Sequence, residues 1–307
     1  MGEFVNNDAT NNEIRFDGRV VVITGASRGL GRSHAELIGS RGAKLVVNDV
    51  SGAVETVAEL RELGIDAVAD TNDISTAEGA AALIAAATDN FGRLDAVINN
   101  AGILRIGSID EQPDEFWHDS IRVNLTGTYY VSRAAWPVFV AQGYGRLVNT
   151  ASAAGMFGVA NNVSYNASKG GVYGLTRGLA AEGEPLGIKV NALAPGAFTP
   201  MAAEFVFSPE MKEQLIESMP VELNSPVVAI LAHEDCPVTG RLIEAGAGRV
   251  GEIFVGDTIG IYDRSLTPES LLDAWDKMVD KSEYRLPKNG EEAMALVALA
   301  AERAKRS

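Results

Sequence analysis

The 307-residue sequence contains one cysteine, Cys236, and only three histidines. A single cysteine cannot form a disulfide within the chain and cannot build a cysteine-based metal cluster. The histidines, His34, His118 and His233, are scattered without the spacing of metal ligands. We therefore expect no metal site, and we expect the reducing environment of the cytoplasm.

Positive charge is also scarce. The sequence has 26 Lys and Arg residues and 41 Asp and Glu residues, which gives a net charge of −15. A surface of that sign does not favour nucleic acid or an anionic membrane as the main partner. No continuous apolar run reaches the roughly 18 residues of a membrane-spanning helix. The polar, Asn-rich residues 1–13 lack the apolar core of a signal peptide and are expected to form a disordered tail.

Short β-branched runs alternate with helical stretches between residues 14 and 248. Residues 20–23 form a continuous β-branched run, typical of a strand buried on both faces, and residues 44–49 and 96–99 are predicted as further strands. Strand, helix and strand joined by short connections indicate a parallel sheet covered by helices. We therefore predict an α/β fold, a single Rossmann-type doubly wound parallel sheet over residues 14–248, with ligands bound beyond the carboxyl ends of its strands.

The later part of the sequence is less regular. Residues 202–219 predict one or two helices separated at Ser208-Pro209. Residues 249–307 are expected to form a C-terminal extension that packs on the same domain or on a neighbouring subunit. Alternation over residues 253–262 predicts a hairpin. Thr267-Pro268 predicts a helix start, running to about residue 280, and a second helix is predicted over about 291–305.

A glycine-rich turn, residues 24–31, follows the first strand with the sequence Thr-Gly-Ala-Ser-Arg-Gly-Leu-Gly. Its glycines permit a tight turn and let the backbone approach a pyrophosphate, which the free N–H groups of the next helix would favour. A purely structural turn is the alternative, but the position between a buried strand and a helix favours a nucleotide site. The predicted contacts are Gly25, Ser27, Arg28, Gly29, Leu30 and Gly31.

Asp49 ends the second strand and predicts NAD rather than NADP as the cofactor. A carboxylate there accepts hydrogen bonds from the ribose hydroxyls of NAD and repels the 2′-phosphate of NADP. Arg28 argues the other way, because a guanidinium can pair with that phosphate. An Asp that merely caps a turn is the structural alternative.

Two further strand ends add candidate cofactor contacts. Asp73 could accept the adenine amino group, and Ile74 could pack on the adenine ring. The backbone of Asn100, Ala101 and Gly102 would line the cofactor. Taken alone, either segment could be an ordinary turn.

Tyr165 and Lys169 are spaced i and i+4, so on a helix they share one face. A free phenol with a pKa near ~10 is a poor base at neutral pH. A nearby ammonium and a positive nicotinamide both favour the phenolate, so the pKa of Tyr165 should fall. Ser152 follows a strand end and could hold the substrate oxygen. A Tyr-x-x-x-Lys pair is common on helices, and only its place downstream of the glycine-rich turn makes it a candidate acid–base pair.

These motifs together resemble the short-chain dehydrogenase/reductase family. Its marks here are, in order, Thr24-Gly25-x-x-x-Gly29-x-Gly31, Asn99-Asn100-Ala101-Gly102, Asn124, Ser152, Tyr165-x-x-x-Lys169 and Pro195-Gly196. The resemblance implies a catalytic tetrad of Asn124, Ser152, Tyr165 and Lys169, and a homodimer or homotetramer built through the helices that hold Asn124 and Tyr165. It implies that Asn124 anchors a water linking Lys169 to solvent and that Lys169 also holds the nicotinamide ribose. Pro195 and Gly196 would adjoin the cofactor, with Thr199 on its carboxamide or a phosphate.

A narrower resemblance is to the dehydrogenase part of the peroxisomal multifunctional enzymes of type 2, which oxidises (3R)-hydroxyacyl-CoA. It is carried by residues 15–20, Val47-Asn48-Asp49 and residues 133–136, whereas residues 197–225 depart from the pattern. The sequence therefore predicts oxidation of a secondary alcohol by NAD, with a 3-hydroxyacyl-CoA as the first substrate candidate. A steroid-like alcohol is the second candidate, and a non-catalytic NAD-binding redox sensor or scaffold is the alternative from another class.

Overall fold

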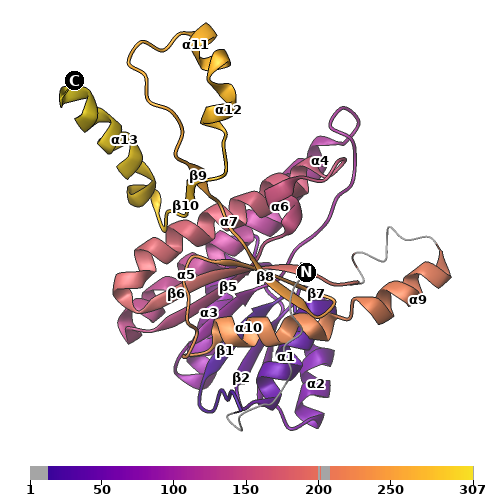
Figure 1. Cartoon of the computed structure of the whole chain (residues 1–307). Helices are drawn as coiled ribbons and strands as arrows, with labels where there is room; N and C mark the ends of the chain where they lie inside the picture. The colour runs from indigo at the N-terminus through magenta and orange to yellow at the C-terminus, as the bar shows by residue number, and fades with distance from the viewer. Residues whose placement is uncertain (1–12, 200, 202–207, 307) are drawn as a thin grey trace. The chain divides into compact units, whose positions relative to one another are not determined.

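The structure is a computed structural model that describes residues 13–199, 201 and 208–306. The chain divides into two compact units, Met1–Gly251 and Glu252–Ser307. The predicted tail at residues 1–13 lies outside the described residues except for Glu13, and so do residues 202–207 of the predicted helices. Figure 1 shows the course of the chain.

An eight-stranded sheet has the order β3-β2-β1-β4-β5-β6-β7-β8. Every registered neighbour pair from β3 to β7 is parallel, which confirms the predicted fold class. The strands are β1 (Val20–Thr24), β2 (Lys44–Asn48), β3 (Ala67–Asp70), β4 (Ala96–Asn99), β5 (Gly145–Thr150), β6 (Ile188–Gly196), β7 (Leu242–Gly246) and β8 (Arg249–Ile253). All residues of β1, β4 and β5 are buried, because both faces of these strands are covered.

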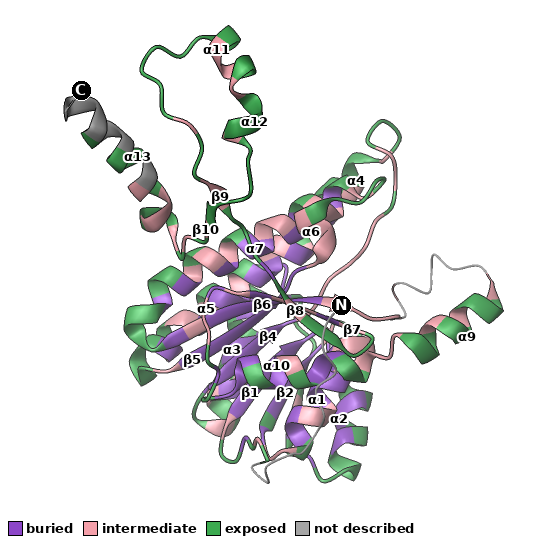
Figure 2. Ribbon diagram, in the orientation of Figure 1, coloured by how far each residue is buried: buried purple, intermediate pink, exposed green. Residues whose placement is uncertain are grey.

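Helices cover both faces of the sheet, as Figures 1 and 2 show. Val21 and Ile23 of β1 face one core, formed with α1 (Gly29–Ser40), α2 (Ala53–Glu62) and α10 (Ser225–Ala232). Val20 and Val22 face the other core, formed with α3 (Ala77–Phe91), α5 (Thr128–Gln142) and α7 (Val163–Gly183). Alternate residues of one strand thus supply two layers.

The strand order places the ligand crevice. After β1 the chain moves outward to β2 and β3 and then returns to β4 on the other side of β1. Connections on either side of this switch point diverge, which opens a crevice at the carboxyl ends of β1 and β4. The glycine-rich turn and Asn100 follow those two ends directly.

The helical segment between β4 and β5 contains a wide turn. The segment consists of α4 (Asp114–Ser120), the π-helix η1 (Ile121–Gly127) and α5. A π-helix is rare, because its wider turn packs poorly, and it commonly marks a functional site. Asn124 lies in its middle.

The hairpin predicted over residues 253–262 is wrong. The hairpin lies earlier, where Ala247 and Gly248 join β7 to β8 with φ of 48° and 80°. Positive φ at both central residues matches the twist of a two-residue antiparallel hairpin. The short strand β9 (Asp257–Thr258) pairs instead with β10 (Tyr284–Arg285), far along the chain.

The Thr267 side chain accepts a hydrogen bond from Ser270 N–H, and Pro268 is the first helical residue, as predicted. The predicted helix does not run on to residue 280, because it breaks at Ala274 into α11 (Pro268–Asp273) and α12 (Trp275–Met278). A final helix, α13, spans Gly290–Arg306. Among the described side chains of residues 254–306 none is buried, and how this extension packs stays a prediction.

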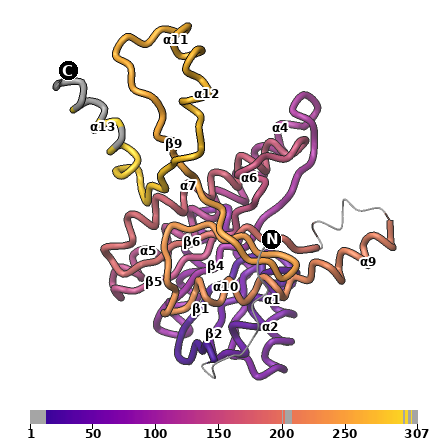
Figure 3. The backbone as a smooth tube through the Cα atoms, in the orientation of Figure 1, coloured from indigo at the N-terminus to yellow at the C-terminus, as the bar shows by residue number. Residues whose placement is uncertain are grey.

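The path from β6 to β7 runs through α9 (Pro209–Ser218), the 3-10 turn η3 (Val221–Asn224) and α10, as the tube in Figure 3 shows. By length and composition alone, residues 209–232 are apolar enough to cross a membrane. The apolar composition of α10 has another cause, because Val228, Leu231 and Ala232 pack into the core against the sheet.

Candidate active site

A cleft of about 490 Å³ opens at the carboxyl ends of the strands. It is lined by most of the predicted site residues: Gly25, Arg28, Gly29, Leu30, Asp49, Asp73, Ile74, Asn100, Ala101, Gly102, Tyr165, Lys169, Pro195 and Thr199. The other five predicted residues, Ser27, Gly31, Asn124, Ser152 and Gly196, lie outside this lining. The structure thus brings together residues that are far apart in the sequence.

The glycine-rich turn is held against the loop after β4. Gly25 has φ of +62°, and a Cβ on it would lie 2.7 Å from Ala101 Cα. The Thr24 hydroxyl accepts hydrogen bonds from the backbone N–H of Asn100 and Ala101 at 3.0 and 3.1 Å. Asn100 Nδ2 donates to the carbonyls of Thr24 and Gly25, both at 3.0 Å. Thr24 is a positioning residue that the sequence motif contained without revealing its role.

The first turn of α1 fits the anionic centre of a dinucleotide. Its N-cap residue, Arg28, makes no side-chain capping bond, and no acidic residue lies in the first turn. Gly29 and Leu30 of this turn line the cleft. Uncapped N–H groups at a helix N-terminus favour a phosphate by hydrogen bonding and by the helix dipole. The residues present therefore fit a pyrophosphate at this position.

Asp49 joins two loops of the cleft wall. Its carboxylate accepts hydrogen bonds from the backbone N–H groups of Ser27 and Ser51, each at 3.2 Å. Ser27 therefore acts through Asp49 and not as part of the lining. Arg28 is exposed beside them. Asp49, which favours NAD, and Arg28, which could favour NADP, thus lie at the same end of the cleft.

Tyr165 and Lys169 lie one turn apart on α7, as their spacing predicted, with Lys169 Nζ 5.8 Å from the centroid of the Tyr165 ring. Lys169 is almost fully buried and its Nζ donates to the Thr150 carbonyl at 2.6 Å. Ser152 caps the short helix α6 (Ala153–Phe157) by accepting a hydrogen bond from Ala154 N–H at 3.2 Å. Its hydroxyl also acts on the Tyr165 phenol, whose pKa it lowers.

The predicted fall in the pKa of Tyr165 does not occur in the chain by itself. Burial raises the pKa of Tyr165 above its ordinary 10.0, and the Ser152 hydroxyl lowers it by a smaller amount. Burial also lowers the pKa of Lys169 to about 8, so its ammonium charge is largely kept at pH 7 and is lost above about pH 8. The positive charge of an oxidised nicotinamide would add to that of Lys169 in favouring a phenolate.

Asn124 lies behind the cleft and is fully buried. Its Oδ1 accepts from Ile103 N–H at 2.8 Å, and its Nδ2 donates to the Ile103 carbonyl and to Ser168 Oγ, each at 3.0 Å. A Cβ on Gly102 would lie 3.2 Å from Asn124 Oδ1 and 3.4 Å from Lys169 Nζ, so Gly102 adjoins both polar groups. The amide of Asn124 thus ties the loop after β4 to α7.

Two remaining predicted residues have backbone roles. A Cβ on Gly31 would lie 2.3 Å from the Gly25 carbonyl, so Gly31 lets α1 pack under the turn. Gly196 ends β6 next to Gly246 of β7, and a Cβ added to Gly196 would lie 3.3 Å from Gly246 Cα. Within the described ranges, no group of three or more His, Cys, Asp or Glu side chains could hold a metal ion.

A doubly wound sheet with an uncapped helix at its switch point, joined to a buried Tyr–Lys pair, defines a nucleotide-dependent dehydrogenase. Comparison with known families gives the narrower class. Residues 19–209 match the family described as short chain dehydrogenase, and the chain belongs to it. It is therefore an oxidoreductase that acts on CH–OH groups and uses NAD or NADP.

Similar proteins fall into two groups by length. Peroxisomal multifunctional enzyme type 2 of Mus musculus is 39% identical over 295 residues, covering 91% of this chain and 39% of that protein. The structure of the full-length enzyme of the same name from Drosophila melanogaster has a TM-score of 0.81 at 32% identity, covering 94% of this chain and 50% of that one. A short chain dehydrogenase from Mycobacterium avium has a TM-score of 0.77 at 33% identity, covering 90% of this chain and 99% of that one. The chain thus spans half or less of these two multifunctional relatives.

Proposed function

We propose that this chain oxidises the hydroxyl group of a 3-hydroxyacyl-CoA to a ketone, with NAD as hydride acceptor, or runs the reverse reaction. The observation that carries the chemistry is the Tyr165–Lys169 pair, set in one cleft with an uncapped helix N-terminus. The substrate rests on similarity to the multifunctional enzymes and on the sequence resemblance described above.

The proposed chemistry assigns a role to each polar group. When bound, the nicotinamide accepts the hydride. Ser152 and Tyr165 would hold the reacting oxygen, and Tyr165 would take its proton as the hydride leaves. Lys169 would hold the nicotinamide ribose and, when protonated, favour the phenolate. Asn124 would anchor a water that carries the proton from Lys169 to solvent. Since its side chain is committed to Ile103 and Ser168, this water would use a remaining lone pair on Asn124.

The preference for NAD over NADP is supported by the position of Asp49. Its carboxylate faces the glycine-rich turn, so a 2′-phosphate held by the adenosine ribose would meet a like charge. Arg28 is exposed and can turn to solvent. The proposed contacts of Pro195, Gly196 and Thr199 with the cofactor follow the family pattern, and Pro195 and Thr199 line the cleft.

A spectrophotometric screen for NADH formation tests the substrate. The chain is offered matched 3-hydroxyacyl-CoAs, hydroxysteroids and simple secondary alcohols, each with NAD. A kcat/KM highest for a 3-hydroxyacyl-CoA supports the proposal. A kcat/KM highest for a hydroxysteroid would change the proposed substrate and leave the proposed hydride transfer unchanged. NADH binding without turnover of any alcohol would make the chain a sensor or scaffold and would end the proposal.

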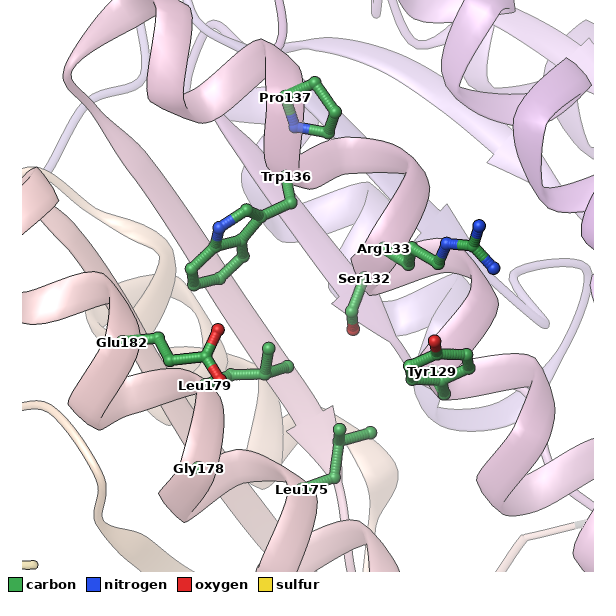
Figure 4. A pocket seen from close by; sticks show the side chains of 9 residues that line it. All are labelled: Tyr129, Ser132, Arg133, Trp136, Pro137, Leu175, Gly178, Leu179 and Glu182. Atoms are coloured by element: carbon green, nitrogen blue, oxygen red, sulfur yellow. The ribbon is translucent and has the colours of Figure 1, made fainter.

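We also propose that the chain forms a homodimer or homotetramer through the helices that hold Asn124 and Tyr165, which are η1 with its continuation α5, and α7. A groove of about 380 Å³ lies on the exposed sides of α5 and α7. Figure 4 shows Tyr129 and Trp136 of α5 on one side and Leu175, Leu179 and Glu182 of α7 on the other. Apolar side chains in an exposed groove favour burial against another surface. Light scattering at micromolar concentration should give a dimer or tetramer, and a Leu179→Arg variant should shift it towards monomer; a monomeric wild type excludes this interface.

A cytoplasmic location is proposed on one feature, the single cysteine, which is buried and free. The relatives named peroxisomal make a peroxisome the competing location. Microscopy of the tagged chain in its own cell distinguishes a diffuse from a punctate distribution.

A further inference from the structure

The loop after β3 is attached to the π-helix η1 at two points. The first is apolar, because Gly127 of η1 lies against Ile74, so closely that a Cβ there would be 3.0 Å from Ile74 Cδ1. The second is polar and is made by Arg122, also on η1, which reaches the residues on either side of Ile74. Asp73, Ile74 and Arg122 all line the same cleft.

Arg122 contacts three acceptors with one guanidinium. Its Nη1 donates to Ser75 Oγ at 2.5 Å and lies 3.5 Å from Asp73 Oδ2. Its Nη2 donates to Asp119 Oδ1 at 3.3 Å. The other oxygen of Asp73 accepts from Ser75 N–H at 2.9 Å. The Asp73 carboxylate is therefore oriented from two sides, by its own loop and by η1.

The ion pair between Arg122 and Asp73 adds little to the stability of the fold, because their side chains are 50% and 51% exposed. Ion pairs at such exposure contribute roughly 0–1 kcal/mol to folding. The contact does, however, hold the second oxygen of a carboxylate whose first oxygen is already held by its own loop. Fixing a hydrogen-bonding group before a ligand arrives lowers the ordering cost of binding.

We propose that Arg122 is a positioning residue that holds Asp73 ready for the amino group of the cofactor's adenine. This inference rests on the proposed nucleotide site. Arginine suits the role, because its planar fork reaches several acceptors at once, whereas a lysine ammonium acts as a single point charge. Because η1 also carries Asn124, the same turn of helix supports both the adenine end and the catalytic end of the cleft.

Calorimetric titration of wild type and Arg122→Gln with AMP, with nicotinamide mononucleotide and with NADH tests the proposal. We expect the Kd for AMP and for NADH to rise about tenfold, the size of one charge-assisted hydrogen bond. The Kd for nicotinamide mononucleotide should not change, since this fragment carries no adenine for Asp73 to bind. In turnover, the KM for NAD should rise while kcat at saturation persists, and Arg122→Lys should restore only part of the affinity.

Two variants separate positioning from general structure. Arg105→Gln removes the same charge from a neighbour that also pairs with Asp119, at 3.7 Å, without touching Asp73, and should leave the AMP affinity unchanged. Asp119→Asn removes one partner of Arg122 and leaves its contacts with Asp73 and Ser75, and should also bind AMP normally.

The proposal is overturned if Arg122→Gln binds AMP like wild type, if it loses both nucleotide fragments equally, or if Asp119→Asn reproduces its loss. Each outcome leaves the proposed function intact as long as wild type binds NADH. If wild type binds neither AMP nor NADH, the nucleotide site itself is refuted and the role of Arg122 is refuted with it.

Discussion

The backbone N–H of Ser27 donates a hydrogen bond to Asp49 Oδ2 at 3.2 Å, which ties the glycine-rich turn to the end of β2. The second carboxylate oxygen accepts from Ser51 N–H at the same distance. Two loops whose N–H groups carry partial positive charge are thus neutralised by one carboxylate. Removing it would expose two N–H donors next to Arg28, which together would favour an anion.

Asp49→Ala should therefore raise the NADP to NAD ratio of kcat/KM by about tenfold or more. Tenfold corresponds to roughly 1.4 kcal/mol, well below the roughly 4 kcal/mol of two unit charges 4 Å apart near a protein surface. The measurement is initial rates with each cofactor at fixed substrate. Asp66→Ala is the control. Asp66 is exposed, lies just before β3 and pairs with Lys44 of β2, away from the cleft. A wild type that already prefers NADP contradicts the role given to Asp49.

Lys169→Met should remove activity and yet stabilise the fold at neutral pH. Burial lowers the pKa of Lys169 from 10.5 to about 8, so at pH 7 the folded chain holds a charge in a site that disfavours it. The difference amounts to roughly 3 kcal/mol. Loss of the charged donor to the Thr150 carbonyl opposes the gain by about 1.5–3 kcal/mol. Urea unfolding at pH 7 and fixed protein concentration should show a small net gain, up to about 1.5 kcal/mol.

The sign of the pH dependence follows from the direction of that pKa. Between about pH 8 and 10.5 the folded chain has released a proton that the unfolded chain still binds, so wild-type stability should rise with pH in this window. The advantage of Lys169→Met should shrink over the same range. Lys44→Met, at an exposed site, serves as control and should show neither effect. A Lys169→Met variant less stable than wild type at pH 7 would refute the buried charge.

Gly31→Ala should weaken cofactor binding by tenfold or more and destabilise the fold. The added Cβ would lie 2.3 Å from the Gly25 carbonyl and 2.6 Å from Asn100 Nδ2, so the turn or the helix must move. Overpacking of this kind costs about 1–3 kcal/mol. NADH titration and thermal unfolding measure the two effects. Ser40→Ala, at the exposed end of α1, adds no atom to the turn and should resemble wild type; a Gly31→Ala variant with normal NADH affinity would contradict this account of the turn.

Features set by local sequence could be predicted. The buried strand β1, the glycine-rich turn after it and the helical spacing of Tyr165 and Lys169 depend on residues adjacent or one helical turn apart. The location of the motifs at one edge of the sheet could be predicted, because the carboxyl ends of parallel strands lie at the same edge. This prediction needed only the alternation of strand and helix.

Features set by distant contacts could not be predicted. Arg122 and Asp73 are joined only when η1 packs on the loop after β3. The π-helix itself has no pattern that distinguishes it from an α-helix in the sequence. Alternation over residues 253–262 pointed to the wrong hairpin, because the turn is decided by positive φ at Ala247 and Gly248. The direction of the Tyr165 pKa likewise depends on burial, which spacing does not reveal.

The central claim is that the Tyr165 hydroxyl exchanges the proton during hydride transfer. Its most direct test is the rate of NADH formation from a 3-hydroxyacyl-CoA by Tyr165→Phe, measured beside NADH affinity. Tyr173→Phe is the control, because it removes a hydroxyl from the same helix outside the cleft lining. We predict a fall in turnover of roughly 10²–10⁴-fold for Tyr165→Phe, with NADH affinity kept and Tyr173→Phe near wild type. Undiminished turnover by Tyr165→Phe would contradict the account.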